Sequence, residues 1–261
     1  MKPIIKWAGG KTALLDQYRC YTPDFNRYYE PFFGGGALFW DLLPQRATIS
    51  DANADLVGVY LAIKHRPLQL IDHLSEHAAK HCSEYYYSLR SRQPQSCHSI
   101  SDAARFFYLN KTCFNGLYRE NSKGQFNVPM GRYKNPRICD PNAIYAASEA
   151  LQGVTIACQD FAETTKGASV GDLVFFDPPY HLAKSFNYKA GGFSPEDQIR
   201  LRDRAIELRD RGVKVMLSNS DCEFVRELYK DFTIVETQRP GNISSDPQKR
   251  QPITELLMLS W

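Results

Sequence analysis

A run of four apolar residues, Leu173-Val174-Phe175-Phe176, constrains the fold of this chain more than any other feature. Polar and apolar positions do not alternate in it, which is the pattern of a strand covered on both faces. Strands of this kind occur in parallel sheets that carry helices on both sides. The run leads directly into Asp177-Pro178-Pro179-Tyr180. A carboxylate and two rigid prolines are therefore expected at the carboxyl end of a buried strand, where open α/β sheets bind their ligands.

The segments on both sides of this strand also carry strand and helix patterns. Strands are predicted at residues 27–30, 47–51, 154–157, 213–218, 232–236 and 255–260, and helices at residues 37–43, 55–63, 65–90, 103–109, 143–150 and 194–211. The last helix has a clear start, because Ser194 is a favoured cap and Pro195 suits the first helical position. Strands that alternate with helices predict a parallel α/β sheet, and the final two strands predict a terminal antiparallel hairpin.

Two parts of the chain differ in their patterns. Residues 1–63 and 142–261 carry the strand and helix alternation, and we expect them to form one α/β domain. Residues 64–141 are predicted to be a mostly helical inserted domain. Within the insertion, the turn signals Asn115-Gly116 and Lys123-Gly124 lie among β-forming residues, which predicts a β-hairpin.

Length and composition are those of an ordinary globular protein. The chain has 261 residues, of which 43% are hydrophobic, and no run approaches the roughly 20 apolar residues that span a membrane. No signal-peptide pattern is recognised. The seven cysteines are scattered and include no Cys-x-x-Cys pair, which favours reduced thiols in a cytoplasmic protein over a zinc site or a disulfide framework. His73, His77 and His81 recur at helical spacing and are interpreted as a solvated stripe, not as metal ligands.

The net charge of +3 does not by itself indicate a nucleic-acid partner, but its distribution is uneven. Residues 105–137 contain seven basic residues and one acidic residue, with seven aromatic side chains interleaved. Basic groups suit phosphate contacts, and aromatic faces suit contacts with bases. The alternative is a solvated face over ordinary core aromatics.

Asp177-Pro178-Pro179-Tyr180 has the chemistry to bind an exocyclic amine. Proline lacks a backbone N–H, so this corner is rich in acceptors, notably the Asp177 carboxylate and the Pro178 carbonyl. An adenine amine is a poor nucleophile because its lone pair is delocalised into the ring. Acceptors on its two N–H bonds would favour a geometry that aims the lone pair, while Tyr180 would hold the ring by stacking. The alternative is a proline-rich turn that merely ends a buried strand.

Two glycine-rich segments precede this corner in the sequence. Phe33-Gly34-Gly35-Gly36 follows a predicted strand and precedes a helix, so its backbone can approach a ligand closely. Asp51 ends the next strand, where an acidic side chain can accept from ribose hydroxyls; the alternative is a helix N-cap. Gly9-Gly10-Lys11-Thr12 is similar to the end of a phosphate-binding loop, but that motif requires a glycine where Ile5 stands.

Five motifs in this order resemble the Dam family of DNA adenine methyltransferases. They are Lys6-Trp7-Ala8-Gly9-Gly10-Lys11, the segment 30–36, Asp51-Ala52-Asn53, the middle motifs within 115–134, and Asp177-Pro178-Pro179-Tyr180. The resemblance covers nearly the whole chain. It implies a Rossmann-like sheet that binds S-adenosylmethionine (AdoMet), and transfer of a methyl group to N6 of an adenine flipped out of double-stranded DNA. It also implies the target sequence GATC.

The resemblance assigns roles to individual residues. The target adenine would be held by Asp177, Pro178, Pro179 and Tyr180. AdoMet contacts are implied at Trp7, Lys11, Phe32, Phe33, Gly34, Gly35, Gly36, Asp51, Asp160, Phe161 and Asp177. DNA contacts are implied at Lys6, Phe114, Asn115, Leu117, Arg119, Pro129 and Arg132. We expect a bacterial or phage-encoded monomer that meets DNA in the cytoplasm, at the nucleoid, with no metal and no membrane segment.

Several alternatives stay open on the sequence alone. The same chemistry would serve a cytosine N4 amine, and a non-catalytic DNA-binding module could keep AdoMet for structure. His181 is interpreted as a surface residue; the alternative is a contact with the substrate. Residues 219–221 are expected either to support the adenine pocket or to cap a helix. Residues 239–250 are expected either to clasp DNA phosphates or to form a hairpin tip.

Overall fold

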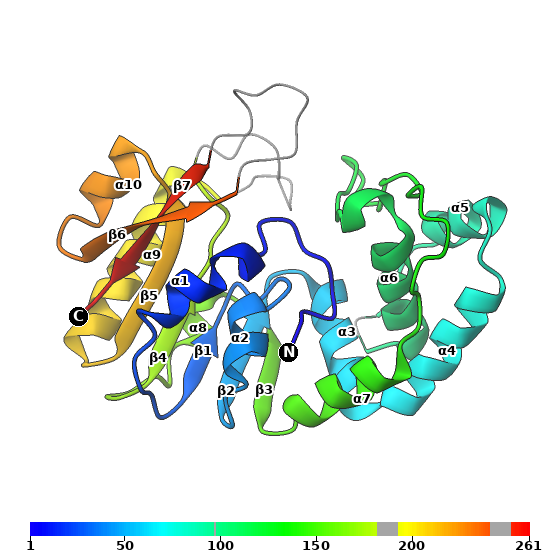
Figure 1. The fold of residues 1–261 in the computed structure, drawn as a ribbon, viewed down its shortest axis with the longest axis horizontal. Helices are drawn as coiled ribbons and strands as arrows, with labels where there is room; N and C mark the ends of the chain where they lie inside the picture. The colour runs from blue at the N-terminus through cyan, green and yellow to red at the C-terminus, as the bar shows by residue number, and fades with distance from the viewer. Residues whose placement is uncertain (97, 182–192, 241–251) are drawn as a thin grey trace.

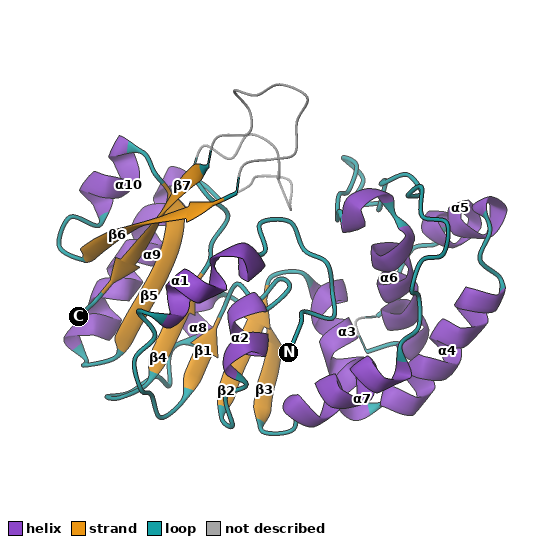
Figure 2. Ribbon diagram, in the orientation of Figure 1, coloured by secondary structure: helices purple, strands orange, loops and turns teal. Residues whose placement is uncertain are grey.

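The protein is an α/β fold built on one seven-stranded sheet (Figures 1 and 2). The computed structural model describes residues 1–96, 98–181, 193–240 and 252–261. The strand order is β3-β2-β1-β4-β5-β7-β6. The strands are β1 (Tyr28–Glu30), β2 (Ala47–Asp51), β3 (Val154–Cys158), β4 (Leu173–Phe176), β5 (Lys214–Ser220), β6 (Thr233–Arg239) and β7 (Ile253–Leu259). Neighbouring strands from β3 to β5 are parallel, whereas β7 is antiparallel to both β5 and β6. The predicted parallel sheet with a terminal antiparallel pair is confirmed.

The helices lie in two groups on the sheet and a third group at its β3 end. Their bounds are η1 (Lys11–Leu14), α1 (Leu15–Arg19), α2 (Ala37–Leu42), α3 (Ala54–His65), α4 (Pro67–Ala79), α5 (Ser83–Ser91), α6 (Ile100–Thr112), η2 (Phe114–Gly116), α7 (Pro141–Ala150), α8 (Phe161–Thr164), α9 (Pro195–Asp210) and α10 (Glu223–Leu228). Figure 1 shows α4, α5, α6 and α7 gathered beside β3, away from the β6–β7 end. None of the helices in the described part of the chain is long and apolar enough to cross a membrane.

Strand β4 is buried on both faces, as its composition predicts. Leu173 and Phe175 belong to a hydrophobic cluster shared with α1, α2 and α3, and this cluster continues into α4 and α6. Val174 and Phe176 belong to a second cluster shared with α8, α9 and α10. All four side chains are at most 1% exposed. Adjacent residues of one strand therefore supply opposite halves of the core, which requires the unbroken apolar run.

Three local expectations differ from the structure. The helix predicted over 65–90 is two helices, because the chain turns after Ala79 and the Cys82 Sγ accepts from the Tyr85 N–H to start α5. The predicted hairpin in 112–132 is irregular: Cys113 and Met130 form one isolated antiparallel bridge, and Glu120 and Phe126 form another. The short helices α1, α8 and α10 were not predicted, since each is only four to six residues long.

Candidate active site

Asp177 lies at the carboxyl end of β4, beside the point where the strand order reverses. Strand β1 has β2 on one side and β4 on the other. The connection after β1 leads to β2, and the connection after β4 leads to β5, so the two connections run to opposite halves of the sheet. Open α/β sheets form their ligand crevices at such a switch point. The loops after β1, β2 and β4 carry the glycine turn, Asp51 and Asp177, and all three therefore meet at one edge.

A buried lysine holds the Asp177 carboxylate. The Lys11 Nζ lies 2.9 Å from Oδ1 of Asp177, and the Ser218 Oγ donates to the same oxygen at 2.7 Å. Lys11 is only 4% exposed, and its Nζ also donates to the Gly9 carbonyl at 2.6 Å. Burial raises the pKa of Asp177, while the Lys11 charge and the Ser218 hydrogen bond act in the opposite direction. The ion pair with Lys11 thus stabilises the ionised form of the Asp177 carboxyl group inside the fold.

The backbone after Asp177 is fixed by side chains of α9 and β5. The Gln198 Nε2 donates to the Pro179 carbonyl at 2.9 Å, and the Asn219 Nδ2 donates to the Gln198 Oε1 at 3.0 Å. Both amides are fully buried. The next residue is held as well, because the His181 N–H donates to Asn219 Oδ1 at 3.3 Å and the Ser220 Oγ donates to the His181 carbonyl at 2.7 Å. The acceptor corner is therefore rigid on both sides.

These contacts bear on two points that the sequence left open. Asn219 and Ser220 support the tetrapeptide instead of capping a helix, since α10 has Cys222 at its N-cap and no side-chain cap hydrogen bond. His181 is half-buried, and its ring packs against Phe224 with centroids 4.4 Å apart. The segment 239–250 falls largely outside the described residues, which include only 239 and 240 of it.

Tyr180 is anchored through its hydroxyl. Its Oη donates to the Glu255 Oε2 at 2.7 Å, and burial, together with the nearby carboxylates, keeps the pKa of the phenol well above its usual value. The Lys11 Nζ lies 4.7 Å from the centroid of the same ring. Glu255 was not predicted from the sequence, although a single carboxylate directly before the apolar run 256–259 is a signal for a buried polar residue.

The glycine turn is organised by Asp51 and packed against Trp7. The Gly34 N–H donates to Asp51 Oδ2 at 2.9 Å, and Gly34 has a φ of +48°. A Cβ at this glycine would lie 2.5 Å from the Trp7 ring. Asp51 is not the N-cap of α3, because Asn53 occupies that position and its side chain accepts from the Leu56 N–H. Trp7 and Asp51 therefore both lie against the backbone of the glycine turn at Gly34.

Aromatic side chains form a wall beside this turn. Phe32 lies next to Phe161, with ring centroids 5.5 Å apart, and next to Phe193 at 5.7 Å. The Arg200 guanidinium covers the Phe161 ring at 4.2 Å and binds both carboxylate oxygens of Asp160. Asp160 also caps α8 by accepting from the Ala162 N–H. Both predicted residues are thus present at this wall, with Arg200 as a partner that the sequence did not indicate.

The residues with implied DNA contacts gather on the irregular loop after α6 and on the N-terminal segment. Phe114 is 48% exposed, and its N–H donates to the Pro129 carbonyl at 2.9 Å. Asn115 has a φ of +54°, which supports the turn predicted there. Five others are placed as follows: Lys6, Arg119, Pro129 and Arg132 are exposed, and Leu117 is half-buried. The Arg119 Nε donates to Asn127 Oδ1 at 2.6 Å, which holds the guanidinium across the loop.

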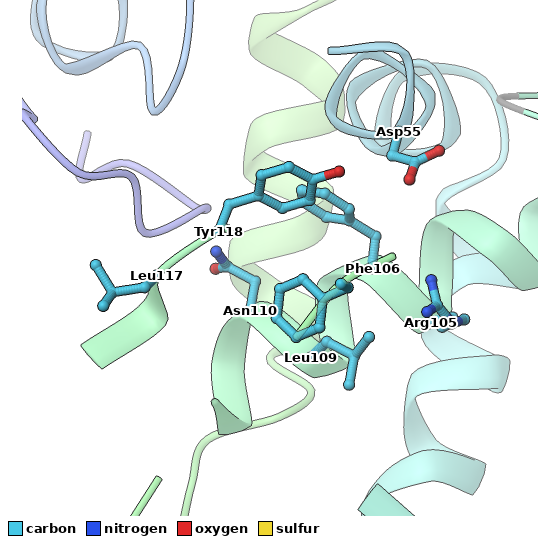
Figure 3. A pocket seen from close by; sticks show the side chains of 8 residues that line it. Asp55, Arg105, Phe106, Leu109, Asn110, Leu117 and Tyr118 are labelled. Atoms are coloured by element: carbon cyan, nitrogen blue, oxygen red, sulfur yellow. The ribbon is translucent and has the colours of Figure 1, made fainter. Parts of the chain in front are cut away.

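Most of the interleaved aromatics in 105–137 belong to the core instead of a DNA-facing surface. Phe106, Phe107 and Tyr108 are at most 5% exposed, whereas Phe114 and Tyr133 are exposed. Arg105 is also buried, and its Nε donates to the Leu89 carbonyl at 2.9 Å. Figure 3 shows Arg105 at a pocket lined also by Asp55, Phe106 and Tyr118. This cavity holds about 10 Å³, room for about one water-sized sphere, so it is too small for a ligand.

The histidine stripe is not solvated as expected. His77 is 8% exposed, its Nδ1 is hydrogen-bonded to the Tyr85 hydroxyl at 2.6 Å, and burial lowers the pKa of its imidazole to about 4. His81 is hydrogen-bonded to the Tyr108 hydroxyl at 2.8 Å. Within the described ranges, no group of histidine, cysteine or acidic side chains has the arrangement of a metal site.

Comparison with known proteins decides the family. The chain matches the profile of the D12 class of N6 adenine-specific DNA methyltransferases over residues 7–243. The chain belongs to this class. It is 42% identical to the type II methyltransferase M1.LlaDCHI of Lactococcus lactis subsp. cremoris, across 100% of this chain and 96% of that protein. It is 39% identical to the type II methyltransferase M.MjaIII of Methanocaldococcus jannaschii, across 100% and 99%, and 33% identical to the DNA adenine methylase of Escherichia coli K12, across 99% and 95%.

A D12-class adenine methyltransferase acts on DNA and requires AdoMet, and the residues at the switch point fit this cofactor. Asp51 at the end of β2 is an acceptor suited to ribose hydroxyls. The Phe32 and Phe161 rings offer apolar faces for an adenine base. The Asp177 carboxylate lies at the same edge of the sheet, and its charge is suited to attract a positively charged sulfonium. These side chains therefore suit a nucleoside that carries a cationic sulfur. The family acts on adenine N6 and is catalytic, so the cytosine N4 and non-catalytic alternatives do not fit it.

Proposed function

We propose that this adenine methyltransferase modifies the adenine of GATC in double-stranded DNA after the base leaves the helix stack. The observation that carries the proposal is the fixed acceptor corner at Asp177, with the anchored Tyr180 ring beside it. A reacting base inside a duplex is out of reach of such a recessed corner, so base extrusion is required.

The chain's own residues would position and activate the amine. The Asp177 carboxylate and the Pro178 carbonyl accept from the two N–H groups of adenine N6, which localises the nitrogen lone pair, and Tyr180 stacks on the ring. AdoMet supplies a methyl group bonded to a positively charged sulfur. Methyl transfer would leave positive charge on N6, which the Asp177 carboxylate would stabilise until one N6 proton is released to solvent.

The same proposal assigns the cofactor and DNA contacts. Trp7, the glycine turn and Asp51 would contact AdoMet together with Lys11, Asp160 and Phe161. Residues 64–141 would act as the target-recognition domain, attached to the AdoMet-binding domain formed by 1–63 and 142–261. Arg119 can donate bidentately to guanine, and Leu117 and Pro129 can meet a thymine methyl group. Lys6 would contact the first guanine, and Arg132 would add a further base contact. The protein would act as a monomer.

Labelled AdoMet and a panel of duplexes test this function. One duplex carries GATC, and four others each carry one changed base pair within it. We expect N6-methyladenine to be labelled fastest in the intact site, and each changed base pair to cost about 1–3 kcal/mol in kcat/KM. The two duplexes changed at a G·C pair keep both adenines, and labelling of these as fast as the intact site would refute the GATC assignment. An Asp177→Ala variant should bind the GATC duplex and lose turnover; full activity in that variant would refute the role of Asp177.

A further inference from the structure

A buried carboxylate on β7, two strands away from β4 in the sheet, is joined to the catalytic corner. Glu255 is 5% exposed, and its Oε2 accepts the Tyr180 hydroxyl at 2.7 Å. Strand β7 is the last strand of the chain, and none of the five family motifs includes it. Among the described residues, Tyr180 and the neighbouring Lys11 connect Glu255 to the reacting region.

Glu255 is itself held in place by the β6–β7 pair. The Arg239 Nε forms an ion pair with the Glu255 Oε1 at 2.6 Å, so the two carboxylate oxygens face different partners. Thr237 donates its hydroxyl to the Glu255 carbonyl at 3.1 Å. Next to Arg239, the backbone of Gln238 is bound by the Gln17 side chain through two hydrogen bonds, at 2.8 and 3.0 Å. Helix α1 thus clamps the strand that carries the arginine.

A fixed ring matters because stacking depends on orientation. A tyrosine ring can tilt about its χ angles, and a flat face for a purine requires one orientation to be held. The Pro179 carbonyl bound by Gln198 fixes the backbone just before Tyr180. The hydroxyl bond to Glu255 fixes the opposite end of the side chain. Together the two anchors leave the ring little freedom.

We propose that Glu255, steadied by Arg239, is a positioning residue for methyl transfer that sets the orientation of Tyr180 against the extruded adenine. This inference rests on the proposed stacking role of Tyr180. Glu255 touches neither adenine nor AdoMet in this scheme. Its effect appears in the chemical step and in base extrusion, while AdoMet binding is unchanged.

A second route for Glu255 would run through Lys11, whose Nζ lies 4.0 Å from the Glu255 Oε2. In that route the carboxylate would tune the charge of the Lys11–Asp177 pair and change AdoMet affinity. The two routes give opposite results in a double-mutant cycle, because only the first requires the Tyr180 hydroxyl.

The experiment combines Glu255→Gln, Tyr180→Phe and the double variant. Each full-length protein is assayed for kcat and KM with a GATC duplex, for AdoMet Kd, and for the fluorescence of 2-aminopurine placed at the target adenine. We expect each single variant to lower kcat roughly ten- to hundredfold, the size of a hydrogen bond to a charged group. The double variant should be no slower than the slower single variant, and AdoMet Kd should change less than twofold. The 2-aminopurine signal on binding should fall in both single variants.

Glu236→Gln is the matched control, because it makes the same chemical change on β6, where the carboxylate is exposed and paired with Arg226. This control should keep wild-type kcat. If Glu255→Gln does not fold, Arg239→Gln replaces it in the cycle. This change removes the ion pair at the Glu255 Oε1 and leaves the hydrogen bond between the Tyr180 hydroxyl and the Glu255 Oε2 in place. The expected direction is the same.

The outcomes separate this inference from the proposed function. If the losses of kcat in the two single variants multiply in the double variant, or if the AdoMet Kd changes tenfold, the route through Tyr180 is overturned. Wild-type kcat in Glu255→Gln, alongside a slow Tyr180→Phe, would overturn the positioning role and leave the proposed function intact. If wild-type protein fails to methylate the GATC duplex, or Tyr180→Ala is fully active, the proposed function itself fails.

Discussion

The Asn110 side chain holds the backbone of Lys6 from both sides. Its Oδ1 accepts the Lys6 N–H at 3.0 Å, and its Nδ2 donates to the Lys6 carbonyl at 2.7 Å. Lys111, the next residue of α6, donates to the Ile4 carbonyl at 2.8 Å. The segment that carries Trp7 and Lys11 is therefore fastened to the same helix end as the Phe114 loop. Residues proposed to contact AdoMet and residues proposed to contact DNA therefore share one connection.

Replacing Asn110 with alanine is expected to loosen this connection. The variant leaves the Lys6 peptide groups without their side-chain partner, which costs about 1–3 kcal/mol of stability. Lys6 then loses its fixed position, so discrimination at the first base pair of the target should fall more than kcat on the intact site. The measurement compares kcat/KM for duplexes with and without the first guanine. Asn135→Ala, at an exposed position, is the control; unchanged discrimination in Asn110→Ala would contradict the coupling.

Gly34→Ala should weaken AdoMet binding. Gly34 has a φ of +48°, and an added Cβ would lie 2.5 Å from the Trp7 ring, so the turn and the indole must move apart. Gly124→Ala is the matched control, because its φ of +71° carries the same kind of backbone strain with nothing within 4 Å of the added Cβ. Strain alone costs roughly 1–2 kcal/mol. AdoMet titration without DNA should show at least a tenfold (about 1.4 kcal/mol) higher Kd only for Gly34→Ala. Equal Kd values in the two variants would contradict the prediction.

Glu30 should make the protein less stable as pH rises. This carboxyl is buried and accepts the Tyr28 hydroxyl at 2.7 Å. Burial raises its pKa to about 8 from an ordinary value of 4.5; Asp177 acts in the same direction, while Tyr28 and Lys11 oppose it. Between these two values the folded protein holds more protons than the unfolded chain. The contribution of Glu30 to the free energy of unfolding is therefore complete below about pH 4.5 and is lost as pH rises through about 8.

Glu30→Gln tests that pH dependence because glutamine keeps the shape and does not titrate. Urea unfolding at pH 5, 7 and 8.5 gives the free energy of unfolding of both proteins. The stability of the wild type relative to the variant should decrease steadily across this range. Parallel curves would show that Glu30 does not titrate between these pH values.

Phe114→Ala should impair base extrusion without affecting the fold. The side chain is 48% exposed, so its removal should change stability by no more than about 0.5 kcal/mol. An exposed aromatic on the loop that we propose to face DNA suits insertion into the gap left by a flipped base. The 2-aminopurine signal should fall in Phe114→Ala and stay at the wild-type level in Tyr145→Ala, which removes a ring that is 44% exposed on α7. A wild-type 2-aminopurine signal in both variants would show that base extrusion does not require the Phe114 ring.

Local patterns in the sequence were sufficient for the sheet and for the main motifs. The run 173–176 predicts a doubly covered strand because burial on both faces leaves no place for a polar side chain, and β4 is such a strand. The turn signals at Asn115-Gly116 likewise correspond to positive φ values. Short helices and the break between α4 and α5 were missed, because a segment of a few residues has too little periodicity to signal its state.

Contacts between distant segments were decided by the tertiary structure alone. The sequence indicated Asp177 and Tyr180, but not that Lys11, Ser218 and Glu255 would surround them. Nor did it show that most aromatics of 105–137 face the core. Periodicity reports which face of its own element a residue occupies, while its partner depends on how the elements pack. The motifs thus follow from local chemistry, and the carboxylate network that anchors Tyr180 exists only because β7 pairs with β5 beside β4.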